Sequence, residues 1–160
     1  MTRSSIFWIG LTIAWMGLIF LFSAQPADES SALSRGLIYS CLDFIVPRID
    51  AMTALERAEL IDALHNPVRK AAHAFIYCVL GLLVCLSVRS VTKPVTGAQR
   101  RVVTLSFIIC ALYAISDEVH QYYVPGRSME LRDMAIDIAG AAIGVAAIHI
   151  LNCRRQAGPG

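Results

Sequence analysis

The sequence predicts an all-α integral membrane protein, a bundle of four transmembrane helices with one or two interfacial helices between the first and the second. Of its 160 residues, 56% are hydrophobic and only 16% are charged, whereas soluble domains carry about 25% charged residues. The mean hydropathy of +0.59 also lies on the apolar side. Four separate apolar runs have the length of about 20 residues that a bilayer requires. A single domain over residues 1–160 accounts for the whole length.

The transmembrane spans are predicted from these four runs. They lie at about 6–23, 68–88, 102–121 and 131–151. The first run is longer than the apolar core of a cleaved signal, which has about 7 to 15 residues, and further apolar runs follow it. In the last span, Gly140 and Gly144 form a Gly-x-x-x-Gly pair, which allows a neighbouring helix to approach closely.

The segment at about 24–67 is too polar to span and is expected outside the cytoplasm. Apolar residues near helical spacing between Leu33 and Ile45 predict an amphipathic helix on the membrane surface. Thr53 and Glu56 have the spacing of a capping box, which predicts the start of a second short helix. Pro67 is expected to end that helix. Both helices could equally pack on the protein's own loops.

The distribution of basic residues predicts the orientation. With four spans, the termini and the linker at 89–101 share one side, which carries seven of the 14 Lys and Arg residues and none of the 12 acidic residues. The positive-inside rule then places both termini in the cytoplasm of a multi-pass protein of the cell membrane. The net charge of +2 and the lack of a long basic run argue against a nucleic-acid partner.

Ionisable residues concentrate at the opposite ends of the last three spans. They are Arg69 and His73 on the second span, Asp117, Glu118, His120 and Gln121 on the third, and Arg127, Asp133 and Asp137 around the start of the fourth. Helical spacing predicts that Arg69, His73 and Tyr77 share one face.

Helical spacing also groups polar residues on the other two spans. On the third span it groups Tyr113, Asp117, His120 and Gln121, and on the fourth it groups Asp133 and Asp137 with the glycine pair. A charge at membrane depth costs about 2.5 to 3.5 kcal/mol, so these faces are expected to meet in one hydrated pocket. The alternative is a set of ion pairs that only locks the bundle.

Two stretches of this polar cluster resemble VanZ-like proteins. They are Arg-Lys-Ala-Ala-His at 69–73 and Asp-Glu-Val-His-Gln-Tyr-Tyr-Val-Pro-Gly-Arg at 117–127, and Phe-Ser-Ala-Gln-Pro at 22–26 and the region 133–144 fit the same family. The resemblance covers all four predicted helices and carries over the polar positions Arg69, His73, Asp117, Glu118, His120, Gln121, Arg127 and Asp133. The family is named for the teicoplanin-resistance protein VanZ, and most members have no assigned reaction. It therefore implies a fold and a link to glycopeptide susceptibility more than a reaction.

The leading hypothesis is an outward-facing site that binds or modifies the head group of an envelope lipid or a lipid-linked cell-wall intermediate. Guanidinium groups bind phosphate well, and histidine is the side chain whose pKa lies nearest neutrality. The candidate catalytic residues are His73, Asp117, Glu118, His120 and Asp133. The candidate substrate-binding residues are Arg69, Gln121, Arg127 and Asp137.

The residues do not decide between catalysis and binding. One alternative is a membrane protein that binds a lipid or drug without turnover, and another is a proton or ion carrier. The aspartates also offer oxygen ligands for a divalent cation. No His-Glu-x-x-His or other recognised metal motif is present, so neither a metal site nor a cofactor is assigned.

Overall fold

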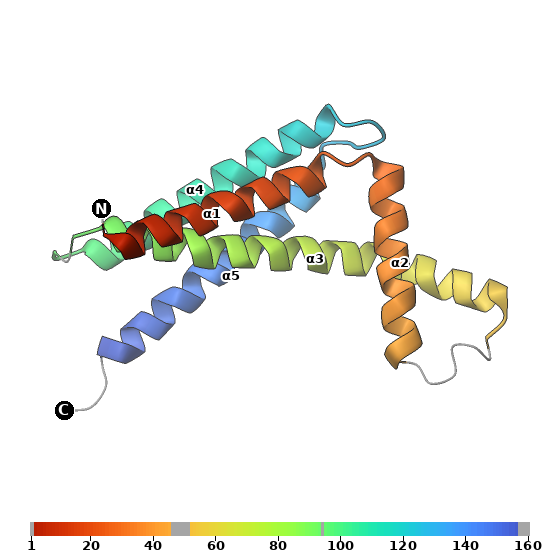
Figure 1. The fold of residues 1–160 in the computed structure, drawn as a ribbon, viewed down its shortest axis with the longest axis horizontal. Helices are drawn as coiled ribbons and strands as arrows, with labels where there is room; N and C mark the ends of the chain where they lie inside the picture. The colour runs from red at the N-terminus through yellow and green to blue at the C-terminus, as the bar shows by residue number, and fades with distance from the viewer. Residues whose placement is uncertain (1, 46–51, 94, 157–160) are drawn as a thin grey trace.

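The computed structural model describes residues 2–45, 52–93 and 95–156, and within them every regular element is a helix. The helices are α1 (Arg3–Ser23), α2 (Ala27–Ile45), α3 (Ala54–Val91), α4 (Ala98–Tyr122) and α5 (Leu131–Gln156) (Figure 1). In the described part, four of them, α1, α3, α4 and α5, are long and apolar enough to cross a membrane. The predicted all-α membrane bundle is confirmed.

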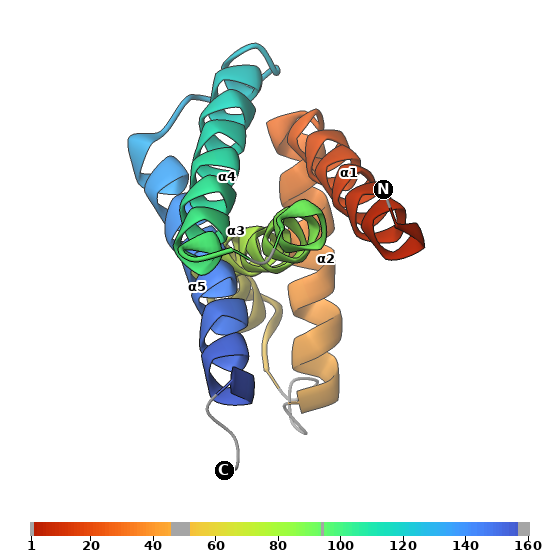
Figure 2. The same cartoon turned by 90° about the vertical axis from the view of Figure 1, so that its left-hand side faces the viewer.

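α3 lies at the centre of the bundle and packs against each of the other four helices. Seen along α3, α1 lies on one side, and α4 and α5 lie on the other (Figure 2). The core includes Tyr77, Leu80 and Val84 of α3 and Cys110 and Ala114 of α4, all of them buried. Because lipid is as apolar as these side chains, such packing relies on close contact and on hydrogen bonds between helices.

α3 and α5 have the most extensive interface, and glycines make it possible. A Cβ atom added to Gly140 would clash with the backbone carbonyl of Ala74, and one added to Gly144 would clash with that of Cys78. Gly81 of α3 makes the reciprocal close contact with the backbone of α5. Such close approach fixes the register of the two helices, and this register sets the polar residues of α3 opposite the carboxylates of α5.

The start of α1 and the end of α5 lie at one end of the bundle (Figure 1). The hydroxyl of Ser5 in α1 donates to the carbonyl oxygen of Ser90 near the end of α3, at 2.9 Å. Gln99 near the start of α4 lies 2.8 Å from the ring of His149 near the end of α5. The opposite end, where α1 ends and α5 begins, is called the site end below because the polar cluster lies there.

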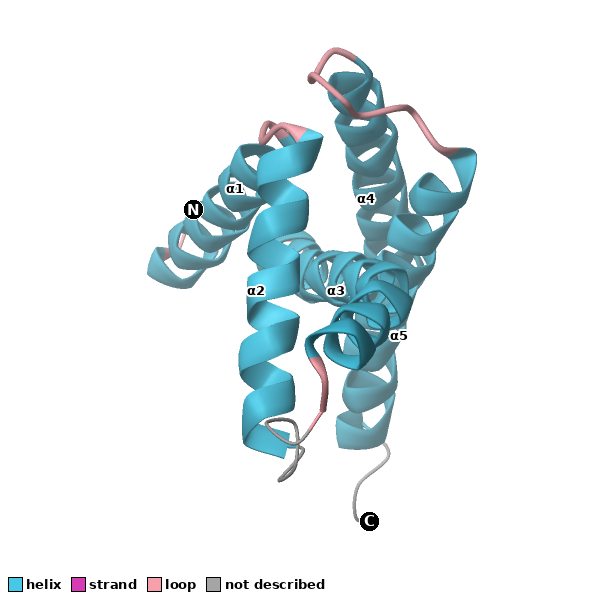
Figure 3. Cartoon of the chain, turned by 90° about the vertical axis from the view of Figure 1, so that its right-hand side faces the viewer, coloured by secondary structure: helices cyan, strands magenta, loops and turns pink. Residues whose placement is uncertain are grey.

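α2 runs across the site end of the bundle (Figure 3). It contacts α3 through an ion pair of 3.0 Å between Arg35 and Asp62. Leu33, Leu37 and Phe44 remain exposed. An amphipathic helix that lies across a membrane bundle and exposes apolar side chains has the properties of an interfacial helix.

One helix boundary predicted from the sequence was wrong. Thr53 and Glu56 form the predicted capping box, but the helix does not end at Pro67 and continues to Val91. A proline inside a helix removes one hydrogen bond and costs about 3 kcal/mol, although its φ suits the helix. Contacts of α3 with α2 and α5 hold the two parts in one helix. The predicted span at 68–88 is therefore the later part of a longer helix.

Candidate functional site

A network of hydrogen bonds, called the clasp below, joins the ends of α1 and α4 to the loop before α5. At its centre, the Arg127 guanidinium donates through Nε to the carbonyl oxygen of Gln25 at 2.9 Å and through Nη2 to that of Phe22 at 3.2 Å. Nη1 of Arg127 donates to Oε1 of Gln121 at 3.1 Å, and Nε2 of Gln121 donates to the hydroxyl of Ser23 at 3.1 Å. All three nitrogens of the guanidinium are therefore in use.

The turn before Arg127 aims its side chain at α1. Gly126 has a φ of 75°, in the left-handed region that favours glycine. A Cβ atom at this position would also lie 3.1 Å from the Cβ of Ala27. The N–H of Ala27 donates to the carbonyl oxygen of Pro125 at 3.2 Å. The loop and the start of α2 are thus fixed together.

Basic residues of α3 face the carboxylates at the start of α5. The Asp133 carboxylate lies 3.4 Å from Nη2 of Arg69 and 3.3 Å from Nζ of Lys70. One turn further, Nδ1 of His73 lies 3.5 Å from Oδ1 of Asp137. Asp137 is fully buried, whereas the side chain of His73 keeps 28% of its surface exposed. The spacing of four residues on both helices therefore brings these side chains together in pairs.

Asp117 of α4 is a buried carboxylate with only neutral partners. Its Oδ2 accepts hydrogen bonds from the hydroxyl of Tyr77 at 3.1 Å and from Nε2 of Gln121 at 3.2 Å. The residue is 4% exposed, and its Oδ1 is buried with no hydrogen-bond partner in the described part of the chain. A buried carboxylate without a cation costs free energy, so Asp117 has unused capacity to accept a donor.

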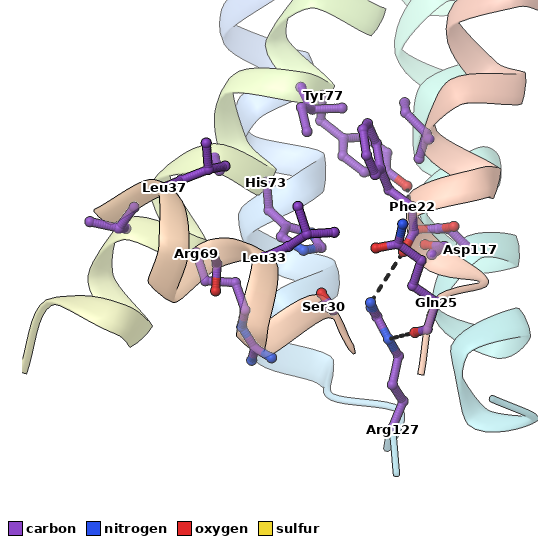
Figure 4. Close-up of a pocket in the computed structure, with 16 residues that line it drawn as sticks. Phe22, Gln25, Ser30, Leu33, Leu37, Arg69, His73, Tyr77, Asp117 and Arg127 are labelled. Atoms are coloured by element: carbon purple, nitrogen blue, oxygen red, sulfur yellow. Dashed lines mark hydrogen bonds between the residues drawn. The ribbon is translucent and has the colours of Figure 1, made fainter. Parts of the chain in front are cut away.

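Some of these polar side chains line one cavity of about 260 Å³ (Figure 4). The charged and larger polar side chains that line it are Gln25, Arg69, His73, Tyr77, Asp117 and Arg127. They come from α3, from α4 and from the links that follow α1 and α4. The spacing of Arg69, His73 and Tyr77 predicted their common face, and the cavity confirms it.

Apolar side chains also line the cavity, and they form what is called its apolar wall below. Phe22, Leu33 and Leu37 line it and are 47%, 54% and 64% exposed. Figure 4 shows Leu33 and Leu37 of α2 on the side of the cavity where Arg69 and His73 lie. The cavity therefore joins exposed apolar side chains to charged groups, which is the combination that an amphiphile requires.

The two arginines of the cavity differ in how fully they are bonded. Burial, followed by repulsion from Arg69, lowers the pKa of Arg127, although a guanidinium keeps its proton in proteins. Arg69 makes one ion pair, with Asp133, and its Nε is buried without a hydrogen-bond partner in the described part. Because the two cations influence each other, an anion bound between them would relieve their repulsion.

Five of the candidate residues do not line the cavity, although the sequence predicted one pocket for all of them. They are Glu118, His120, Gln121, Asp133 and Asp137. The Glu118 carboxylate is buried and accepts the backbone N–H of Glu130 at 2.9 Å, which ties α4 to the start of α5. The ring of His120 stacks on Phe20 of α1, with centroids 4.5 Å apart.

His120 was expected to point into the pocket with Asp117, but it does not line the cavity. At about 100° per residue, His120 and Gln121 flank Asp117 on either side of the same face. α1 packs beside α4 and receives the ring of His120 there.

In the part of the chain that the structure describes, no group of three His, Cys, Asp or Glu residues is arranged to hold a metal ion. Asp117, Asp133 and Asp137 do not form such a group. The ionisable side chains that line the cavity offer guanidinium, carboxylate, imidazole and phenol groups.

The contribution of α1 and α2 to the site was missing from the candidate residues. Ser23 and Gln25 belong to the clasp, and Leu33 and Leu37 form part of the apolar wall. The stretch Phe-Ser-Ala-Gln-Pro at 22–26 was the available indication.

Comparison with known proteins places the whole site within one family. A family model described as VanZ/LLP1 matches residues 8–152. No curated protein and no solved structure matches the chain. The matched region contains every residue that lines the cavity.

Proposed function

This chain belongs to the VanZ/LLP1 family, and from that premise we propose that its cavity binds the phosphate-bearing head group of an envelope lipid or lipid-linked cell-wall intermediate. The observation that carries the proposal is the union of two guanidinium groups and an exposed apolar wall in one cavity. With the termini in the cytoplasm, as the positive-inside rule predicts, the cavity lies at the outer face of the cell membrane.

Arg69 and Arg127 recognise the phosphate in this proposal. Arg69 has unused donors beside a single long ion pair, and Arg127 retains one further N–H on each of its two Nη atoms. Guanidinium groups form paired, charge-assisted hydrogen bonds with phosphate oxygens. Lys70 stays with Asp133 at the edge of the cavity.

The apolar wall accommodates the start of a lipid chain. Phe22, Leu33 and Leu37 are exposed in the protein alone. The hydrocarbon chain of the ligand can contact them in place of the surrounding membrane lipid. α2, which lies across the site end, then separates the bound head group from the bulk water.

His73 is the candidate general acid or base of a reaction on the head group. The Asp137 carboxylate lies 3.5 Å from Nδ1, so this ion pair orients the ring, while Nε2 has no hydrogen-bond partner in the described part of the chain. An imidazole oriented by a carboxylate is suited to transferring a proton. Asp133 holds Arg69, and Glu118 fixes the start of α5, so both position other groups.

A second candidate is binding without turnover, by which the protein sequesters or masks a lipid or drug. The apolar wall beside the two arginines supports it, because these groups can hold an amphiphile without any reaction. Under either proposal, fewer accessible lipid-linked intermediates would alter susceptibility to glycopeptides such as teicoplanin. A proton or ion carrier is the third possibility from the sequence, and conductance in protein-loaded vesicles would reveal it.

The test compares variants in a sensitive host at matched membrane levels. His73→Ala and Asp137→Asn should abolish any change in lipid head groups that the wild type produces, as measured by mass spectrometry of extracted lipids. His65→Ala is the matched control, because His65 lies on α3 outside the cavity. If resistance persists in His73→Ala, catalysis by this histidine is wrong. If resistance is lost while the lipids stay unchanged, binding without turnover is favoured.

A further inference from the structure

We infer that the preferred ligand carries both a phosphate and a primary ammonium on its head group, as an aminophospholipid does. The inference rests on the proposed function and specifies its ligand. It starts from two opposite charges in the cavity wall, Asp117 and Arg127, each of which has only neutral hydrogen-bond partners.

The negative charge belongs to Asp117. Tyr77 and Gln121 both donate to its Oδ2, which leaves Oδ1 buried and without a partner in the described part, and Asp117 itself lines the cavity. A carboxylate in this position is stabilised by a cation that also donates hydrogen bonds. A primary ammonium has three N–H donors and meets both requirements.

The positive charge belongs to Arg127. Its hydrogen bonds go to the carbonyl oxygens of Gln25 and Phe22 and to the amide oxygen of Gln121. None of these acceptors is charged, so no directly bonded carboxylate neutralises the guanidinium in the described part of the chain. Arg69 adds a second cation on the facing side of the cavity.

Gln121 separates these two charges by a single amide group. Its Nε2 donates to Asp117 at 3.2 Å, and its Oε1 accepts from Arg127 at 3.1 Å. The wall therefore presents a negative and a positive group a short distance apart, in fixed order. A zwitterion whose ammonium and phosphate are joined by a short linker matches this order, with its ammonium at Asp117 and its phosphate at the arginines.

Other cations are less suited than a primary ammonium to neutralise the Asp117 carboxylate. The described residues include no group of three ligands for a metal ion. A quaternary ammonium, as in a choline head group, has the charge but no N–H to donate to Oδ1. The cavity should therefore prefer ethanolamine-type head groups to choline-type ones.

The experiment measures binding of lipids that differ only in the head group. Full-length protein in phosphatidylcholine nanodiscs is supplied with dioleoyl phosphatidylethanolamine, its N-acetyl derivative, or phosphatidylglycerol, and bound lipid is counted by native mass spectrometry. We expect phosphatidylethanolamine to bind about tenfold more tightly than the other lipids, because they lack the ammonium. A polyprenyl-phosphate amino sugar forms a fourth arm, and tighter binding there would identify a cell-wall intermediate as the source of the same chemistry.

Two variants test whether the Asp117 carboxylate causes the preference for phosphatidylethanolamine. Asp117→Asn should bind all these lipids with similar affinity, whereas Asp62→Asn, which removes an exposed acid outside the cavity, should keep the preference. The N-acetyl lipid tests the ammonium in the wild type and so does not depend on the variant's folding. Equal binding of phosphatidylethanolamine and its N-acetyl derivative, or a preference that survives in Asp117→Asn, would overturn this inference and leave phosphate recognition intact. If no phosphate-bearing lipid binds, the proposed function itself fails.

Discussion

The clasp around Arg127 and the cavity surface around His73 are both built from charged groups at the site end, but the clasp makes more hydrogen bonds within the protein. All three nitrogens of Arg127 donate to the protein's own oxygens, whereas Arg69 makes one ion pair of 3.4 Å. Both carboxylate oxygens of Asp137 and one of Asp117 have no hydrogen-bond partner in the described part.

This difference separates structural from functional groups within one cluster. A completed hydrogen-bond network stabilises the fold, because losing one partner leaves the others buried and unsatisfied. Groups left incomplete cost stability, and at membrane depth they persist where they are functional. Arg127 and Arg69 therefore have different main roles, although both belong to the motifs that resemble VanZ-like proteins.

The difference between the clasp and the cavity depends on the register of α3 and α5. The largest loss of stability is therefore expected from a change at their glycine contact. Gly144→Ala places a methyl group against the carbonyl of Cys78, which should destabilise the protein by about 3 kcal/mol or more. The apparent melting temperature in detergent measures this loss. Gly17→Ala is the control, because a Cβ there meets no atom within 4 Å. Equal melting temperatures of the two variants would refute the close packing.

The next largest effect should distinguish the two arginines. Arg127→Met leaves three oxygen acceptors of the clasp without their donor, at about 1 kcal/mol each, so the expected loss is about 3 kcal/mol. Arg69→Met breaks one partly exposed ion pair, for which the expected loss is below about 1 kcal/mol. Thermal unfolding of both variants under the same conditions checks the contrast. A larger loss for Arg69→Met would reverse the roles assigned above.

A third variant separates ligand affinity from stability on the apolar wall. Leu37→Gln should weaken lipid binding about tenfold, because a half-buried leucine contact contributes about 1.4 kcal/mol, while the melting temperature stays nearly constant. Leu55→Gln changes an equally exposed leucine outside the cavity and should leave affinity unchanged. Lipid titration in nanodiscs measures both variants. Similar affinities would remove the apolar wall from the site.

The smallest effect is expected from Glu118→Gln. The amide oxygen still accepts the N–H of Glu130 but without the charge, so the loss should be about 1 kcal/mol or less. Lipid binding should not change, since Glu118 does not line the cavity. Hydrogen exchange at the start of α5 would detect the weaker contact. An altered head-group preference in this variant would place Glu118 in the site after all.

The sequence could predict the faces of the site because helical spacing is local information. Arg69 and His73 on α3 and Asp133 and Asp137 on α5 repeat every four residues, and the structure pairs them in that order. The glycine pair follows the same face of α5. Once a bundle is expected, charged faces have to point inward, so the meeting of these residues follows.

Contacts between distant segments could not be predicted in the same way. The helix continues through Pro67, with α2 in contact with the part before it and α5 in contact with the part after it, and a local rule for helix ends does not include such packing. His120 turns to Phe20 because α1 lies on that side of α4. The clasp depends on backbone carbonyls of α1 about 100 residues before Arg127, and no local pattern indicates a carbonyl partner.

The most direct test of a phosphate-binding cavity is native mass spectrometry of the purified protein beside its Arg69→Gln variant. The wild type should retain a phosphate-bearing lipid that Arg69→Gln loses. Arg100→Gln, which removes an exposed charge at the opposite end of the bundle, should retain that lipid. Equal lipid occupancy in the wild type and Arg69→Gln would contradict the account.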